Sequence, residues 1–203
     1  MDISILGYLL IILSYLVGSL SSAIILCKLA GLPDPRTEGS GNPGATNVMR
    51  IGGKKLAALT LVGDLLKGLI PVVVATLLHQ SALTISLVAV AAFLGHLFPL
   101  FFGFKGGKGV ATALGAILGL NPLVGLCAFG VWIVIFIISK ISSLSALIAA
   151  ISVPFFLYFF NAPLAIVGAV IFMDIFLIYR HKANIQRLLS GEEGKLKAKK
   201  NEK

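Results

Sequence analysis

The apolar stretch ISILGYLLIILSYLVGSLSSAIILC, residues 3–27, is the part of the sequence that decides the fold. A hydrocarbon core about 30 Å thick needs about 20 consecutive apolar residues in a straight helix, and this stretch is long enough. No basic segment precedes it, it is longer than the apolar core of a signal peptide, and it continues to Lys28. We therefore expect a transmembrane helix that is retained in the mature protein.

The composition extends this expectation to the whole chain. Hydrophobic residues make up 58% and charged residues 12% of the 203 residues, and the mean hydropathy is +1.01. Polar side chains are too few to cover a water-facing surface. We predict an all-α, polytopic integral membrane protein with about seven transmembrane helices, at residues 3–27, 56–78, 83–102, 109–120, 123–139, 143–160 and 163–179. The fourth is too short to cross alone, so it is expected to tilt, to pack beside a glycine-lined cavity or to stop short of one face.

The basic residues predict the orientation. With seven crossings and the C-terminus inside, the cytoplasmic ends collect nearly all Lys and Arg, whereas the outer turns hold only Asp2 and His79. The N-terminus is then outside. The net charge of +9 reflects this asymmetry, so no nucleic-acid partner is expected. Basic residues near the chain end attract anionic headgroups of the lipid bilayer. We expect a membrane domain, residues 1–190, and a disordered basic cytoplasmic tail, residues 191–203.

Polar residues gather in three segments on the predicted cytoplasmic face: RTEGSGNPGATNVMR (36–50), FKGGKGVAT (104–112) and YRHKANIQR (179–187). The second segment is a glycine-rich turn that enters a helix, so unpaired backbone N–H groups and the positive end of the helix dipole face the interface. Its glycines, Gly106, Gly107 and Gly109, allow a phosphate to approach closely, and Lys105 and Lys108 add charge. It matches neither a Walker A loop nor a dinucleotide-binding motif. A positive-inside loop with glycines as turn residues is the alternative.

The first and third segments supply further donors. The first offers the neutral groups of Ser40, Asn42, Thr46 and Asn47, with Arg36 and Arg50 at its ends. A plain turn around Asn-Pro-Gly is the alternative. In the third, a helical continuation places His181 and Asn184 on one face, with Arg180 and Arg187 nearby. A basic helix end at the membrane surface is the alternative there.

Ionisable residues inside the predicted spans need partners. Asp64 and Lys67 are three residues apart and are expected to pair or to line a polar cavity, with Asp174 as a candidate third member. His79 and His96 are assigned to structure. No His, Cys and carboxylate set has metal-ligand spacing, so no metal and no cofactor are expected.

Many cations and amides, without paired carboxylates or a Ser–His–Asp arrangement, suit the binding of phosphate-bearing substrates better than hydrolysis. The motifs GSGNPGATNVMR, HLFPLFFGFKGGKGVATALG and YRHKANIQRLLSGEE together resemble the bacterial acyl-phosphate-dependent glycerol-3-phosphate acyltransferases, and the resemblance covers essentially the whole chain. It implies a multi-pass enzyme of the bacterial inner membrane with a cytoplasmic active site. Such an enzyme, in phospholipid biosynthesis, transfers a fatty acyl group from acyl phosphate to the sn-1 hydroxyl of glycerol 3-phosphate and yields lysophosphatidate and phosphate.

The resemblance also implies roles for residues. Ser40, Arg50, Lys108 and Asn184 match positions that hold the phosphate of glycerol 3-phosphate, His181 matches the histidine of the third motif, and the turn from Gly106 to Thr112 matches the segment that receives acyl phosphate. The glycine turn and Lys108 would stabilise the charge on the departing phosphate.

The expected reaction also needs an acceptor for a proton and a place for the acyl chain. The proton of the attacking hydroxyl goes to His181 or to an oxygen of acyl phosphate; the oxygen is favoured because no carboxylate is placed to orient the histidine. The acyl chain is expected in a groove where Gly115 and Gly119 leave room.

A membrane transporter of phosphate or an organophosphate is the alternative function. Against it, the polar residues cluster at one face instead of the midplane, and no inverted repeat is found. Acyltransferases with a His-x4-Asp pair are excluded, because the fifth residues after the three histidines are Thr84, Phe101 and Gln186.

Overall fold

The structure of the protein is a computed structural model, in which residues 3–194 are described. The first apolar stretch forms two helices, α1 (Ile5–Gly18) and α2 (Ser22–Leu29), which meet at an angle of 42°. The hydroxyl of Ser21 accepts a hydrogen bond from the backbone N–H of Ile24 and so starts a second helix. The transmembrane helix predicted at residues 3–27 is therefore broken into two helices, which together are long and apolar enough for one span. Asp2, which the orientation argument placed in an outer turn, lies outside the described residues.

Helix α3 (Ala45–Leu77) begins within the first polar segment and not at residue 56 as predicted. Gly53, with φ of 79°, bends it, because this left-handed backbone conformation interrupts a right-handed helix. The residues before the bend, Arg50 among them, form a separate helical piece that leads into the long apolar part. A stretch read as a loop from its glycines and asparagines is thus partly helical.

The remaining elements follow the predicted spans to within a few residues, except the last, which is the helical continuation expected in the third polar segment. They are α4 (Ala82–Leu97), the 3-10 helix η1 (Leu100–Phe102), α5 (Val110–Leu120), α6 (Pro122–Ser139), α7 (Ser142–Phe159), α8 (Leu164–Arg180) and α9 (Lys182–Leu189). Local chemistry sets their starts: Ser81 caps α4, and Asn121 caps α6 with Pro122 in its first position. No strand occurs in residues 3–194, which confirms the all-helical prediction.

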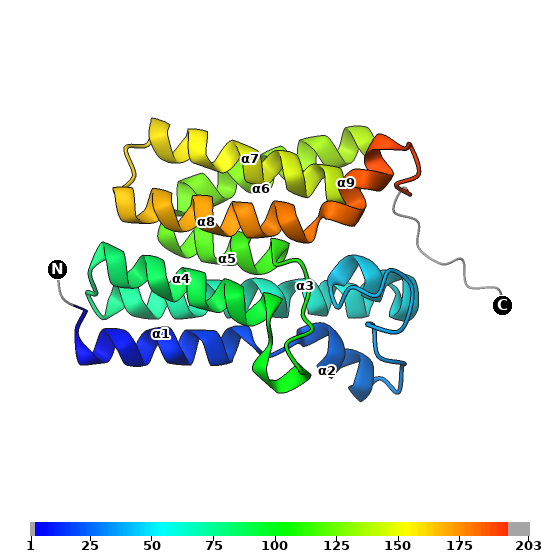
Figure 1. Cartoon of the computed structure of the whole chain (residues 1–203), viewed down its shortest axis with the longest axis horizontal. Helices are drawn as coiled ribbons and strands as arrows, with labels where there is room; N and C mark the ends of the chain where they lie inside the picture. The colour runs from blue at the N-terminus through cyan, green and yellow to red at the C-terminus, as the bar shows by residue number, and fades with distance from the viewer. Residues whose placement is uncertain (1–2, 195–203) are drawn as a thin grey trace.

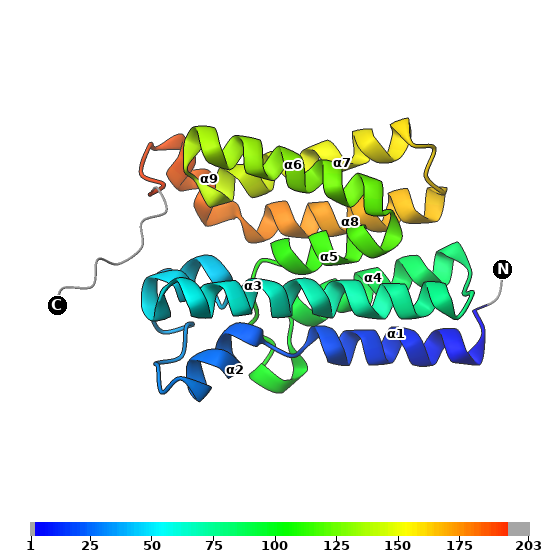
Figure 2. The same ribbon diagram turned by 180° about the vertical axis from the view of Figure 1, so that it is seen from behind.

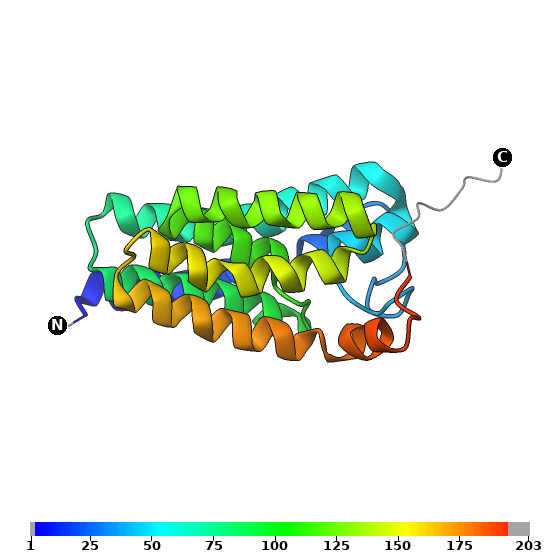
Figure 3. The same cartoon turned by 90° about the horizontal axis from the view of Figure 1, so that it is seen from above.

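The long helices run side by side along one axis of the molecule (Figure 1). Helices α1, α3 and α4 lie on one side and α6, α7 and α8 on the other, with α5 between them (Figure 2). Helix α2, the first turns of α3, and α9 gather at one end, seen also from above (Figure 3). The N-terminus of α5 is recessed from that end (Figure 1). Phe93, Leu97, Leu157 and Met173 fill the core.

Within residues 3–194, four helices are long and apolar enough to cross a membrane, or up to six if each bent pair is one span, and α5 is a shorter apolar helix. Large apolar side chains, including Ile12, Ile137 and Phe155, are exposed on the outer helix faces. Such a surface suits lipid, not water. The number of crossings and the placement of the termini remain predictions.

The buried ions form a network around α3. Lys67 Nζ lies 2.8 Å from Asp64 Oδ1 and donates to the carbonyl of Leu20 at 2.8 Å, in the break between α1 and α2. Thr112 Oγ1 donates to the Asp64 carbonyl at 2.9 Å and lies 3.2 Å from His96 Nδ1. The predicted pair is confirmed. The third member is His96 and not Asp174, because no ion pair or hydrogen bond joins Asp174 to this group within the described chain.

Candidate functional site

The glycine turn that joins η1 to α5 is held by its own backbone and by one arginine. The N–H groups of Gly106 and Gly107 donate to the carbonyls of Leu97 and His96, both at 3.2 Å. Arg180 donates to the two glycine carbonyls, with Nη2 2.7 Å from Gly106 O and Nε 3.1 Å from Gly107 O. These two N–H groups, predicted to face an anion, are therefore already paired, and the two glycines position the residues that follow.

The free donors lie just after those glycines. In residues 3–194, no acceptor bonds the backbone N–H groups from Lys108 to Thr112, which open α5. Gly109 has φ of 87°, and a Cβ there would lie 2.3 Å from Phe93 Cε2. Only glycine fits there, and the unpaired N–H groups lie at the positive end of the helix dipole, which favours an anion.

Lys108 joins the second polar segment to the third. Its ammonium donates to Asn184 Oδ1. Asn184 Nδ2 donates to Glu193 Oε1 at 2.5 Å, and Glu193 also accepts from Ser143 Oγ and Arg187 Nε, each at 2.6 Å. Because an ammonium only donates and a carboxylate only accepts, these partners fix which way the Asn184 amide points.

Several charges act on Lys108. Burial lowers the pKa of its ammonium to about 8; Glu193 opposes this shift, and Arg187, Arg180 and Arg50 add to it. Arg50, from the first segment, therefore lies within electrostatic reach of the other two. Burial alone would raise the pKa of Glu193, but hydrogen bonds from Ser143, Asn184 and Arg187 bring the pKa below its ordinary value, so the carboxylate is ionised. The cluster still carries excess positive charge, which suits an anionic ligand.

His181 is buried beside this cluster, with Nδ1 2.8 Å from the carbonyl of Leu177. Burial is the main cause that lowers its pKa to about 4. The imidazole is then neutral, and since a carbonyl only accepts, Nδ1 carries the proton and Nε2 is an acceptor. The histidine is oriented after all, by a backbone carbonyl and not by a carboxylate.

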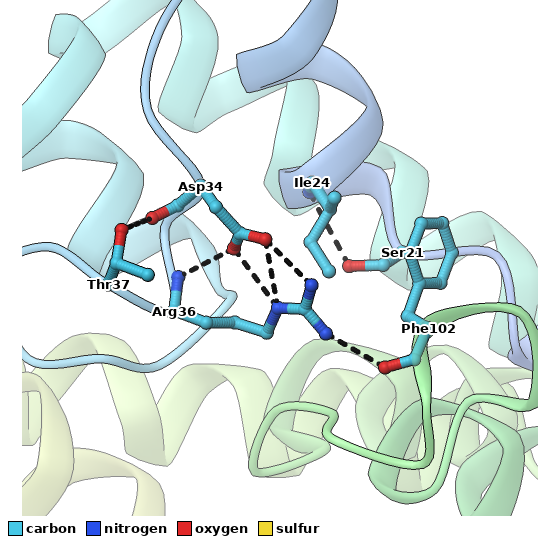
Figure 4. Close-up of polar contacts among 6 residues, drawn as sticks. All are labelled: Ser21, Ile24, Asp34, Arg36, Thr37 and Phe102. Carbon is cyan, nitrogen blue, oxygen red and sulfur yellow. Dashed lines mark hydrogen bonds and ion pairs between the residues drawn. The ribbon is translucent and has the colours of Figure 1, made fainter.

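One arginine ties the first segment to the second. The Arg36 guanidinium pairs with both oxygens of Asp34, with Nη2 2.7 Å from Oδ2, and its Nη1 donates to the Phe102 carbonyl at 2.8 Å (Figure 4). Asn47 folds the same loop: its Oδ1 accepts from the N–H of Ser40, and its Nδ2 donates to two loop carbonyls. Arg36 and Asn47 therefore shape the loop.

The other predicted residues differ in availability. No described residue bonds the side chains of Ser40, Asn42, Arg50 and Lys105, which leaves them free for a ligand. Lys105 is exposed and lines a shallow depression with Arg36. Thr112 is fully buried and its hydroxyl points into the buried network instead, so its side chain is not available to a ligand.

A narrow apolar groove starts at Val110, next to Lys108, and runs between α5, α6, α7 and α8. Gly115 and Gly119, expected to make room for an acyl chain, do not line it. A Cβ on Gly115 would lie 2.0 Å from the Leu65 carbonyl, and one on Gly119 2.8 Å from Val72. These glycines let α5 pack tightly against α3, and the groove follows another face of α5.

Sequence reasoning passed over three residues of the site. Arg180 was read as a neighbour and holds the glycine turn. Glu193 stood in the third motif without a role, and its carboxylate orders the cluster. Ser143 has no signal, because only the fold brings the start of α7 to this end.

The protein is a helical membrane protein whose cationic, donor-rich site is recessed at one end, beside an apolar groove. These features define the class of membrane proteins that bind phosphate-bearing lipids or their precursors. The profile of the family described as Glycerol-3-phosphate acyltransferase matches residues 8–191. The chain belongs to this family, as the motifs predicted.

Individual relatives agree. A glycerol-3-phosphate acyltransferase of Thioalkalivibrio sulfidiphilus is 56% identical over 92% of both chains, and one of Methylococcus capsulatus is 53% identical over 95% of this chain and 97% of the other. The crystal structure of PlsY (YgiH), an integral membrane glycerol 3-phosphate acyltransferase, in its glycerol 3-phosphate form has a TM-score of 0.91 and 42% identity, covering 94% of this chain and 96% of that one. Its lysophosphatidic acid form has a TM-score of 0.88.

Proposed function

We propose that this protein transfers a fatty acyl group from acyl phosphate to the sn-1 hydroxyl of glycerol 3-phosphate, giving lysophosphatidate and phosphate. The observation that carries the proposal is the junction at Lys108, where a lysine bonded to Asn184 has the first of five unpaired N–H groups and adjoins an apolar groove. Membership of the family supplies the reaction class. The crystal forms of PlsY with glycerol 3-phosphate and lysophosphatidic acid support the acceptor and the product.

Each phosphate has its own donors in this proposal. Ser40, Asn42, Arg50, Lys108 and Asn184 bind the phosphate of glycerol 3-phosphate; the first three have no competing side-chain partner in the described chain. The N–H groups that open α5 bind acyl phosphate, with Gly109 giving close access. Gly106 and Gly107 hold that turn in place through Arg180, and Lys105 contributes charge at the rim.

The chemistry requires positioning and charge stabilisation. An acyl phosphate is a mixed anhydride with a good leaving group, so the enzyme has to bring two repelling phosphates together and aim the hydroxyl at the carbonyl carbon. The new C–O bond forms as the bond to phosphate breaks and its electron pair leaves with the phosphate. Lys108 and the free N–H groups stabilise that charge.

The proton goes to an oxygen of the departing phosphate. His181 is a weak base, because burial lowers its pKa to about 4. Its neutral Nε2 accepts a hydrogen bond from the glycerol hydroxyl and orients it. The histidine thus acts catalytically by orientation, and the reaction needs no covalent intermediate.

The setting follows from the sequence. Seven segments cross the inner membrane of a bacterium, the N-terminus is outside, and the site faces the cytoplasm, where basic residues concentrate. Residues 1–190 form the membrane acyltransferase domain. The basic tail expected at residues 191–203 includes Glu193, which Asn184 and Arg187 hold in the site, so the part that lies on the bilayer surface follows that residue; residues 195–203 lie outside the described chain.

One assay tests the function. Purified protein in detergent is incubated with palmitoyl phosphate and glycerol 3-phosphate, and the products are measured. We expect lysophosphatidate and phosphate in equal amounts. We expect no turnover with palmitoyl-CoA or palmitoyl acyl carrier protein, because the N–H groups accommodate a small phosphate. Comparable rates with a thioester donor would contradict the acyl-phosphate assignment, and no lysophosphatidate from any donor would contradict the function.

A further inference from the structure

The apolar groove contains one group that the proposed reaction does not use. Asp174, on α8, is the one ionisable residue among the described residues that line it, together with side chains such as Ala113, Ile117 and Val153. Asp174 is 7% exposed. A carboxyl group so placed inside a membrane span is costly, so the structure keeps a polar atom where apolar contact would be more stable.

The carboxyl group has no compensating partner. Asp174 Oδ2 is buried with no hydrogen-bond partner in residues 3–194, and none of the ion pairs in that part of the chain includes Asp174. The carboxylates of Asp64 and Glu193 differ from that of Asp174, because Asp64 forms an ion pair with Lys67 and Glu193 has three donors; among buried side chains of the described residues, Ser86 Oγ also has no hydrogen-bond partner. The groove is therefore the direction from which Asp174 can be hydrated.

The depth of Asp174 in the groove determines which acyl chains can contact it. Asp174 precedes His181 by two turns on α8, about 10 Å along the helix axis. An acyl chain that starts at the N-terminus of α5 meets Asp174 only if the chain is long enough to reach that depth. A short chain ends above it.

We propose that Asp174 is a specificity-determining residue of the acyl-chain groove, and this inference rests on the proposed function. A long chain displaces water from the carboxyl group and leaves it unpaired, which offsets part of the gain from burying additional methylene groups. A short chain leaves the carboxyl group hydrated. Asp174 therefore limits the preference for long acyl phosphates and favours the release of long-chain product.

The test compares wild type, Asp174→Leu, Asp174→Ala and Asp174→Asn with palmitoyl phosphate and butyryl phosphate at saturating glycerol 3-phosphate. The readout is the ratio of kcat/KM for the two donors, in which differences in the amount of folded enzyme cancel. In Asp174→Leu and Asp174→Ala the ratio of palmitoyl to butyryl should rise about tenfold or more, because no polar group is left unpaired. Asp174→Asn is the matched control: it keeps an unpaired polar group of the same shape and should stay within about threefold of wild type. Equal ratios in all four enzymes, or equal changes with both donors, would overturn the inference.

A binding measurement separates this inference from the proposed function. The thermal stabilisation of each variant by palmitoyl phosphate and by butyryl phosphate is measured without glycerol 3-phosphate. If wild type transfers no acyl group but palmitoyl phosphate stabilises Asp174→Leu more than wild type, the groove inference stands and the reaction is wrong. If transfer occurs and neither the ratio nor the stabilisation changes, the reaction stands and Asp174 has no part in selectivity.

Discussion

At the scale of single residues, Lys108 and Lys105 provide a matched pair in one turn. Lys108 is bonded to Asn184 and adjoins the free N–H groups, whereas Lys105 is exposed without a partner in the described chain. If Lys108 contacts phosphate through charge-assisted bonds of about 1.5–3 kcal/mol, Lys108→Ala should lower kcat/KM by about tenfold to a hundredfold. Lys105→Ala should cost less. Steady-state kinetics on both folded variants, with each substrate varied in turn, would reject the role of Lys108 if its loss left turnover unchanged.

The same lysine predicts a pH dependence. Burial, with opposing and assisting charges nearby, lowers the pKa of Lys108 to about 8. Only the protonated form binds phosphate, so kcat/KM of the free enzyme should be highest below that pKa and fall as the pH rises through about 8. The second pKa of a phosphate, about 6, is well below this range. In Lys108→Arg the guanidinium stays charged, so any activity it retains should lack this decline.

A decline in kcat/KM that is identical in wild type and Lys108→Arg would assign the titration to another group. Spontaneous loss of acyl phosphate at high pH is measured without enzyme and subtracted. Bound phosphate stabilises the protonated lysine, so kcat should decline at higher pH than kcat/KM.

The sequence predicted the chemical types of the site residues better than their positions and contacts. Donor types at Ser40, Arg50, Lys108 and Asn184 pointed to an anion, because amides and cations in glycine-rich segments have few other uses. The hydrogen-bond partners of these residues could not be predicted. Nothing local shows that Asn47 folds its own loop, or that Gly106 gives its N–H to Leu97. Those contacts join residues that the folding of the loops brings together and that no short local pattern pairs.

At the scale of elements, the entrance to α5 depends on Gly109. Gly109→Ala should abolish most activity, because a methyl group would lie 2.3 Å from the Phe93 ring in addition to the strain of φ at 87°. Gly103→Ala is the control: φ is 66°, yet nothing lies within 4 Å of the added carbon. It carries the strain alone, about 1–2 kcal/mol. Activity and thermal stability of both variants in detergent are compared; equal losses would show that the clash at Phe93 is not limiting.

The buried ion pair joins α3 to the break between α1 and α2, and its removal tests that junction. Lys67→Met leaves Asp64 buried without its partner and should lower the free energy of unfolding by about 3–5 kcal/mol. The double variant Asp64→Leu with Lys67→Met removes both charges and should recover much of that loss. Thermal unfolding in detergent gives the comparison. A double variant no more stable than Lys67→Met would mean that the Leu20 contact, and not the charge on Asp64, sets the cost.

Element existence was predictable because apolar runs of helical length are strong signals, and the boundaries were not. The break at Ser19–Ser21 lies within a run of continuous hydropathy. Its causes are the cap at Ser21 and the distant Lys67, whose ammonium donates to the carbonyl of Leu20. The early start of α3 was hidden by Asn-Pro-Gly, which favours a turn just before Ala45.

At the scale of the whole molecule, the predicted orientation can be tested on α3, because one helix crosses the bilayer with its two ends on opposite sides. From Lys54 to Leu77 the helix is about 36 Å long at 1.5 Å per residue, enough to span a hydrocarbon core of about 30 Å. Single cysteines are placed at the exposed positions Lys54 and Leu78 after Cys27→Ala and Cys127→Ala. A membrane-impermeant maleimide should label Leu78→Cys in intact cells and Lys54→Cys only after the inner membrane is opened.

Two further exposed positions, Ile5→Cys and Ser190→Cys, then report on which side the two ends of the chain lie. Label at Ile5 from outside and at Ser190 only from inside requires an odd number of crossings, which agrees with seven and excludes four or six; both ends on one side would show that α5, or one of the bent pairs, does not cross.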